Sequence, residues 1–223
     1  MVEFSDWGDF LDCVISLMEG MIIDKFDIIL LGWNGNLESC LGLFSGLIDY
    51  HIAPNDHKKP DECIKFEESL ESSNVLNKWQ ESKANNGETP IFHLFQREYR
   101  DFNVDDFKKL DMEIQEKGIL LAKGQVLFRG VCSENENDDW TKPVSTTLSP
   151  YIAIYHALKN GYTKPIKIYV IEVPVDSKVK AIIGPFGDNV EFGQEYEVLV
   201  NFKHRPKVNE EITKGSVTFQ LLG

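Results

Sequence analysis

In residues 144–158, VSTTLSPYIAIYHAL, the residue pattern changes near the middle from one typical of a strand to one typical of a helix. Residues 144–148 are mostly β-branched or hydroxyl-bearing, which predicts a strand. Ser149 suits a helix N-cap, Pro150 suits the first helical position, and Gly161 can end the helix. The apolar residues that follow at helical spacing predict its buried face: Tyr151, Ile154, Tyr155 and Leu158.

Short apolar runs of the same kind surround this strand–helix unit in the second half of the chain. They predict strands over residues 125–129, 144–148, 167–175, 181–183, 196–202 and 217–222. Residues 61–118 instead repeat their apolar side chains every three or four positions, which predicts helices that end at Gly118. A helical half followed by a strand-rich half predicts an α+β fold.

The N-terminal region, residues 1–60, is apolar and interrupted by glycines, and we interpret it as a helical extension or lobe. Prolines and Asn55 make residues 51–60 a loop and a possible boundary, so residues 61–223 would form the main domain. Two roles are open for the extension. Apolar helices usually belong to a core, which favours a lobe over a docking surface for an antitoxin, a regulator or the target.

The charge balance limits the classes of function. The chain has 223 residues, and its 23 basic and 36 acidic side chains give a net charge of −13. Such a chain lacks the basic surface of a dedicated nucleic-acid-binding protein, and anionic membranes would repel it. An enzyme that meets nucleic acid only at its active site is not excluded. Hydrophobic residues make up 42%, enough for a substantial core.

Cysteine and histidine spacing gives no metal site and no disulfide framework. The four cysteines include no C-x-x-C pair, and the five histidines form no H-E-x-x-H set. The start of the chain is acidic rather than basic, so no signal peptide is expected. The most apolar stretch, residues 14–31, contains four charged residues and cannot span a bilayer. We expect a cytoplasmic protein, or one delivered into a target cell by a signal-independent route.

Three weak motifs carry candidate chemistry. Of the four arginines, Arg129 alone lies in a predicted strand, where its planar guanidinium group needs an anionic partner. The next residue, Gly130, would let a ligand approach the backbone. Ser145 and Thr147 lie on one face of the next predicted strand and could orient a carboxylate or a sugar. Taken separately, a local ion pair and ordinary strand propensity explain these residues better.

Glu195 and Glu197 form the third motif, at the entrance of an apolar strand. If the backbone is extended there, both side chains project to one side, about 6–7 Å apart at Cα. Two carboxylates so placed can take separate roles. An acidic chain also produces such pairs by chance, and Glu134-Asn135-Glu136 is a second copy in a polar loop.

In this order the three motifs resemble those of the mono-ADP-ribosyltransferases of the cholera-toxin-like class, whose pattern is Arg, Ser-Thr-Ser and Glu-x-Glu. The resemblance covers about residues 90–205, with Thr147 in place of the last serine. Phe192 resembles the aromatic residue of the family's turn–turn loop. The matching segments are Leu127-Phe128-Arg129-Gly130, Ser145-Thr146-Thr147 and Glu195-Tyr196-Glu197-Val198-Leu199.

The resemblance implies a helical lobe on a split β-sandwich that binds NAD and needs no metal. Glu197 would be the catalytic glutamate on the ribose 2′-hydroxyl, and Glu195 would position and deprotonate an acceptor guanidinium. Arg129 would hold an NAD phosphate, and the Gly130 backbone would contact the nicotinamide carboxamide. The remaining implied contacts belong to Ser145, which would orient Glu197, to Thr147, which would support the site, and to Phe192, which would touch the acceptor.

Several functions remain open within this resemblance. Glutamate at position 195, rather than glutamine, resembles the arginine-modifying branch of the family, which implies transfer of ADP-ribose to protein arginine. Transfer to a nucleic-acid base, such as RNA, or to water as an NAD glycohydrolase are alternatives. From another class, a non-catalytic module of the same fold would bind NAD or a partner. An inhibitor, antitoxin or regulator is a possible further partner, and no membrane partner is expected.

Overall fold

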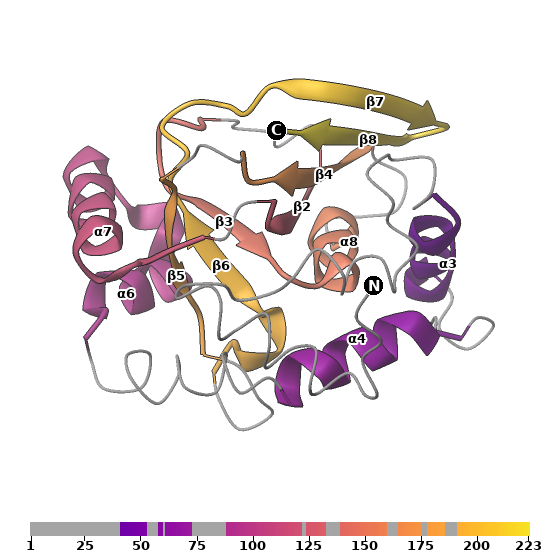
Figure 1. The fold of residues 1–223 in the computed structure, drawn as a ribbon, viewed down its shortest axis with the longest axis horizontal. Helices are drawn as coiled ribbons and strands as arrows, with labels where there is room; N and C mark the ends of the chain where they lie inside the picture. The colour runs from indigo at the N-terminus through magenta and orange to yellow at the C-terminus, as the bar shows by residue number, and fades with distance from the viewer. Residues whose placement is uncertain are drawn as a thin grey trace, which may run out of the picture.

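The computed structural model describes residues 41–52, 58–59, 61–72, 88–121, 124–132, 139–159, 165–174, 178–185 and 191–223 (Figure 1). Its helices are α3 (Leu41–Ile52), α4 (Asp61–Ser72), α6 (Pro90–Glu98), η3 (Tyr99–Asp101), α7 (Val104–Lys117), α8 (Pro150–Leu158) and η5 (Gly193–Glu195). Its strands are β1 (Ile119–Leu120), β2 (Val126–Cys132), β3 (Val144–Thr147), β4 (Ile166–Glu172), β5 (Lys180–Ile183), β6 (Glu197–Val200), β7 (Val208–Lys214) and β8 (Val217–Leu222).

The described strands form one eight-stranded sheet in the order β1-β5-β6-β3-β2-β4-β8-β7. All neighbouring strands are antiparallel except β4 and β8. The ladder between β2 and β3 consists of the single pair Phe128 and Thr147, whereas β2 pairs with β4 along its whole length. The sheet is therefore almost interrupted in its middle. Helices together with this sheet confirm the predicted α+β class.

Two strands were not predicted, and each lacks the pattern that marks a half-buried strand. Strand β7 lies at an edge of the sheet, and most of its side chains are exposed, so its sequence VNEEITK has no apolar alternation. Strand β1 has two residues. The predicted strand over residues 196–202 begins one residue later, at Glu197, because Tyr196 has a left-handed backbone with φ 46°.

Helix α8 packs on β2 and β4, and it begins as the sequence predicts. The Ser149 hydroxyl accepts a hydrogen bond from the Ile152 amide, and Pro150 opens the helix. The predicted buried face is partly wrong, because Tyr155 is 43% exposed while Ala153 and Ala157 are fully buried. Small side chains face the sheet because the helix approaches strand β2 closely at Gly130, so the larger tyrosines are displaced to the flanks.

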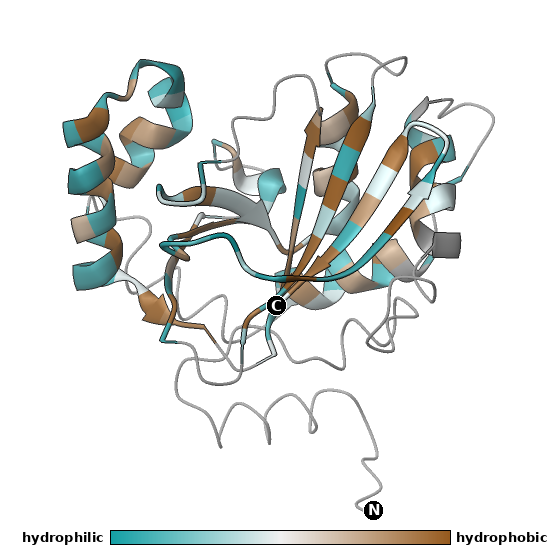
Figure 2. Ribbon diagram, turned by 90° about the horizontal axis from the view of Figure 1, so that it is seen from above, coloured by the Kyte–Doolittle hydropathy of each residue, from teal (hydrophilic) through white to brown (hydrophobic). Residues whose placement is uncertain are grey.

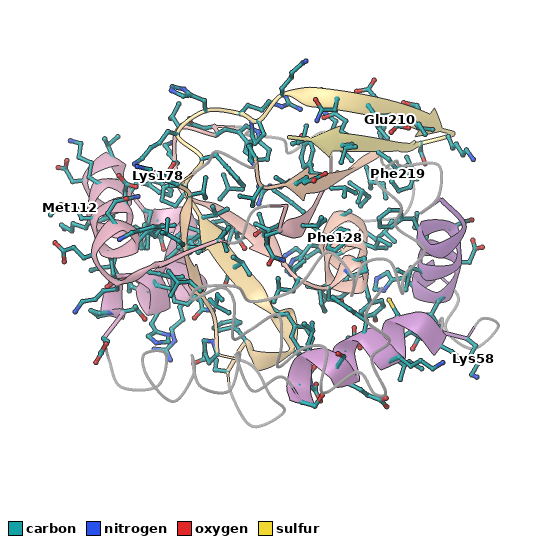
Figure 3. The ribbon with its side chains drawn as sticks, viewed as in Figure 1. Lys58, Met112, Phe128, Lys178, Glu210 and Phe219 are labelled. Carbon is teal, nitrogen blue, oxygen red and sulfur yellow. The ribbon has the colours of Figure 1, made fainter. Side chains whose placement is uncertain are left out.

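The core joins the sheet to the first described helix. The Phe44 ring of α3 lies 5.2 Å from that of Phe219 on β8 and 6.3 Å from that of Phe128 on β2. Figure 3 shows Phe128 in the interior, and Figure 2 shows apolar and polar residues alternating along the central strands. Residues 1–40, most of the predicted extension, lie outside the described residues, and the boundary near residue 60 stays a prediction. None of the described helices is long and apolar enough to cross a membrane.

Helices α6 and α7 pack together at the opposite side of the sheet from α3 (Figure 1). The buried Glu113 carboxylate of α7 accepts hydrogen bonds from the amides of Ile91, at 3.1 Å, and Phe92, at 2.7 Å, in the first turn of α6. The Thr89 side chain at the N-cap makes no capping hydrogen bond. A side chain from a neighbouring helix therefore satisfies these terminal amide groups.

We expect Glu113→Ala to lower the free energy of unfolding by about 2 kcal/mol, because it leaves one buried and one partly buried amide of α6 without this partner. Urea unfolding followed by circular dichroism measures this loss. The matched control is Glu116→Ala, an exposed glutamate on the same helix, which should change stability by less than about 0.5 kcal/mol. Equal effects of the two substitutions would contradict the capping role.

Candidate active site

A cleft of about 690 Å³ opens where β2 and β3 diverge beyond their single residue pair. Its walls come from α6, η3, α7, β2, β3, α8, η5 and β6. The volume falls within the usual range for a small-molecule site. All seven predicted site residues line it: Arg129, Gly130, Ser145, Thr147, Phe192, Glu195 and Glu197.

Glu197 is the first residue of β6, and its buried side chain lines this cleft. Its carboxylate accepts a hydrogen bond from the Ser145 hydroxyl and another, at 2.9 Å, from the Gln96 amide of α6. Burial raises the pKa of Glu197, and these two hydrogen bonds and the charge of Arg129 oppose the rise. The carboxylate is thus held rigidly in a largely water-free position.

Arg129 lies on β2 and reaches across the gap to β3. Its guanidinium donates a hydrogen bond to the Ser145 carbonyl at 2.7 Å. The residue is half-buried, so its charge acts in an environment that screens it less than bulk water does. Ser145 therefore joins the two charged groups, with its carbonyl on Arg129 and its hydroxyl on Glu197.

Glu195 does not lie on the strand, which corrects the prediction that both glutamates project from one extended segment. It ends η5, between Phe192 with φ 61° and Tyr196 with φ 46°. A left-handed backbone at two aromatic residues costs about 1–2 kcal/mol each. Because this turn separates the two glutamates, the directions of their side chains are independent of each other, whereas on a continuous strand both would project to the same side.

Contacts from distant segments hold this strained turn. The Thr147 hydroxyl donates to the Glu195 carbonyl at 2.7 Å, and the Leu148 amide donates to the Tyr196 carbonyl at 3.1 Å. The Tyr196 hydroxyl donates to a Glu71 carboxylate oxygen at 2.6 Å. Thr147 thus uses its hydroxyl to fix the turn that carries Glu195.

Gly130 has a different reason for lacking a side chain than the one expected. A Cβ at this position would lie 1.7 Å from the Ala153 carbonyl oxygen of α8. The bare face of the glycine therefore admits the helix rather than a ligand. Its backbone still lines the cleft, on the stretch of β2 that has no residue pair with β3.

The cleft differs in charge from the protein as a whole. Four cationic side chains and three carboxylates line it, although the whole chain carries a net charge of −13. Such a local excess of positive charge favours an anionic ligand. The cationic residues are Arg100, Arg129, Lys142 and Lys159, and the carboxylates are Asp139, Glu195 and Glu197.

Three residues of the cleft that act on the two glutamates or on their neighbours were not found from the sequence. Gln96 contacts a carboxylate that is 101 positions away along the chain, and nothing in its helical neighbours marks it. His156 lies in the last turn of α8 and Lys159 directly after it, and neither belongs to a sequence motif. Among the described residues, no group of three or more His, Cys, Asp or Glu side chains is placed to hold a metal ion.

No family model matches the chain, and no curated protein matches it. The solved structures that are similar include the ADP-ribosyltransferase Vis with an M6 inhibitor, at 12% identity and a TM-score of 0.34, covering 89% of each chain. Vis with agmatine has 10% identity and a TM-score of 0.34, over 99% of this chain and 86% of that one. The Vis toxin from Vibrio splendidus has 12% identity and a TM-score of 0.33, over 99% and 87%. These values are low, so the function proposed next rests on the residues of the cleft.

Proposed function

We propose that the protein is an NAD-dependent mono-ADP-ribosyltransferase that transfers ADP-ribose to arginine side chains of a protein and releases nicotinamide. One observation carries the proposal: a single cleft brings together Arg129, Ser145 and the buried Glu197, with Glu195 on a separate turn beside them. We further propose that the interrupted sheet is the split β-sandwich of this enzyme class.

The first step breaks the glycosidic bond between the nicotinamide nitrogen and ribose C1′. The bonding electron pair leaves with nicotinamide, and positive charge grows on the sugar. A preorganised carboxylate lowers the energy of such an oxocarbenium-like transition state. Glu197 suits this role because Ser145 and Gln96 fix its position. In this proposal its carboxylate binds the ribose 2′-hydroxyl.

The second step forms a bond between a guanidinium nitrogen of the acceptor and C1′. The nitrogen loses one proton, and we assign that proton to the Glu195 carboxylate. Burial raises the pKa of Glu195, which makes the carboxylate a better base, while the charge of Lys159 partly opposes the rise. Its side chain remains 35% exposed, so an acceptor can reach it from solvent.

The other cleft residues bind and orient the two substrates. Arg129 would contact an NAD phosphate, in keeping with the cationic lining of the cleft. The Gly130 backbone would contact the nicotinamide carboxamide, and Phe192 would contact the acceptor. The same proposal includes an inhibitor or regulator as a binding partner of the enzyme. It also places the enzyme in the cytoplasm, or delivers it into a target cell.

The proposal is tested by following nicotinamide release from NAD and the gain in intact mass of proteins and RNA in a lysate. Wild type should release nicotinamide and add ADP-ribose to protein, and Glu197→Gln should do neither. Hydroxylamine sensitivity of the adduct then tests the arginine linkage. Agmatine, with which Vis was crystallised, serves as a small guanidinium acceptor.

Other outcomes of the same assay point to the alternative functions. An adduct on RNA alone would change the acceptor class to a nucleobase. Nicotinamide release without any adduct would indicate an NAD glycohydrolase. Binding of NAD without release would indicate a non-catalytic module, and would contradict the proposed enzyme.

We expect Gln96→Ala to lower nicotinamide release by about 10-fold at neutral pH, because a hydrogen bond to a charged group contributes about 1.5 kcal/mol. It should also raise the pKa of Glu197 further, since the ionised form loses a donor. Activity needs the ionised carboxylate and is lost as the pH falls through its pKa, so the acidic limb of the rate profile should move to higher pH. The control is Gln115→Ala, at an exposed position on α7. An unshifted acidic limb would contradict the role of Gln96.

A further inference from the structure

The helix that follows the second motif places a histidine beside Glu195. His156 lies in the last turn of α8 and lines the cleft. Its Nε2 atom is 3.7 Å from Glu195 Oε1, just beyond hydrogen-bond distance. In the described part of the chain Glu197 has two hydrogen-bond donors, Ser145 and Gln96, whereas Glu195 has this imidazole next to it.

Lys159 determines which nitrogen of His156 carries the proton. Its Nζ atom lies 2.9 Å from His156 Nδ1. A lysine ammonium group only donates, so Nδ1 must accept, and the proton of the neutral ring must be on Nε2. The imidazole therefore presents an N–H group to Glu195. Hydrogen bonds of this kind are often long in a free enzyme and shorten when substrate binds.

Burial, helped by two neighbouring positive charges, keeps the imidazole ring of His156 neutral. Burial, the charge of Lys159 at the C-cap of α8 and that of Arg129 on β2 lower the pKa of His156 to about 4. Glu195 on η5 is the carboxylate that faces the ring. With its pKa so low, the imidazole is a poor base at neutral pH, whereas the Glu195 carboxylate remains able to accept a proton. The two groups thus suit different tasks, one as a donor that orients and the other as a base.

We propose that His156, held by Lys159, is a positioning residue that orients the Glu195 carboxylate toward the acceptor. The role rests on the proposed transferase activity and belongs to its second step. As the acceptor nitrogen bonds to C1′, its proton passes to Glu195, while the His156 proton stays on Nε2 throughout. Breaking the nicotinamide bond depends on Glu197 instead. Loss of His156 should therefore impair transfer more than hydrolysis of NAD.

The kinetic test compares transfer to agmatine with hydrolysis of NAD in the full chain. His156→Ala should lower the ratio of transfer to hydrolysis by about 10-fold, because Glu195 loses its orientation. His156→Gln keeps an N–H donor near the position of Nε2 and should restore most of the ratio. His204→Ala removes an exposed histidine that does not line the cleft and should leave the ratio unchanged. An unchanged ratio in His156→Ala would overturn the positioning role.

A second measurement does not depend on activity or on the folding of a variant. Nuclear magnetic resonance of labelled histidine in the wild type should show His156 as the neutral tautomer with its proton on Nε2 at neutral pH. A proton on Nδ1, or a charged ring, would overturn the proposal. Absence of nicotinamide release from the wild type is a separate result, because it would contradict the proposed function itself and the positioning role with it.

Discussion

Glu197→Gln is expected to lower nicotinamide release by about 10³-fold, because the amide cannot balance the positive charge that grows on the sugar. The substitution keeps the shape of the side chain, and its amide oxygen can still accept one of the two hydrogen bonds that Ser145 and Gln96 donate to the carboxylate. Binding of NAD should change by less than about 3-fold, since the ground state needs no charge at this position. Isothermal titration with NAD and single-turnover kinetics separate these two quantities.

The same substitution should make the fold more stable at neutral pH. Burial holds the pKa of Glu197 above that of an unfolded carboxyl, so its contribution favours the fold at acidic pH and is lost as the pH rises through the folded-state pKa. Removing the charge should raise Tm by roughly 2 °C at neutral pH and by less at acidic pH. Glu116→Gln, at an exposed site, should leave Tm unchanged. Loss of both activity and stability would mean that Glu197 serves the fold rather than the chemistry.

Gly130→Ala is expected to lower the free energy of unfolding by about 3 kcal/mol, which corresponds to roughly 6–12 °C in Tm. The added Cβ would lie 1.7 Å from the Ala153 carbonyl oxygen and 3.0 Å from the Ala157 Cβ. The first contact is with helix backbone, so relief requires α8 to move away from β2. Differential scanning calorimetry measures the change.

Gly215→Ala is the control for this clash. Gly215 has φ 59° in the turn between β7 and β8, and a Cβ there would meet no atom within 4 Å. Its substitution should cost about 1–2 kcal/mol from backbone strain alone. If Gly130→Ala were no more destabilising than this control, the close approach of α8 to β2 would be contradicted.

Local signals in the sequence predicted most of the regular structure. Ser149 caps α8 and Pro150 opens it, because capping depends on a few neighbouring residues. Strand β8 has the predicted bounds, since its sequence VTFQLL alternates apolar residues with Thr218 and Gln220 and a short turn precedes it. Strand β7 was not predicted, because an exposed edge strand has no apolar alternation to detect.

The buried face of α8 could not be predicted from helical spacing. Periodicity gives the angular separation of side chains around a helix, but not which side meets the sheet. Gly130 on β2 decides that, because the close approach there selects Ala153 and Ala157 over Tyr155. The conformation of Glu195 also depends on distant contacts, from Thr147 and Glu71, that hold the left-handed Tyr196.

By itself, the sequence determined the α+β class and the candidate residues Arg129, Ser145 and Glu197. The spacing of apolar residues and the chemistry of side chains are properties of short segments, so both can be read without the tertiary structure. The tertiary structure alone decided that these residues share one cleft, that Gln96 donates to Glu197 across 101 positions, and that His156 lies beside Glu195. These contacts join segments far apart in the chain. They depend on how α6, α8 and η5 pack around the interrupted sheet, and no local pattern of residues encodes that packing.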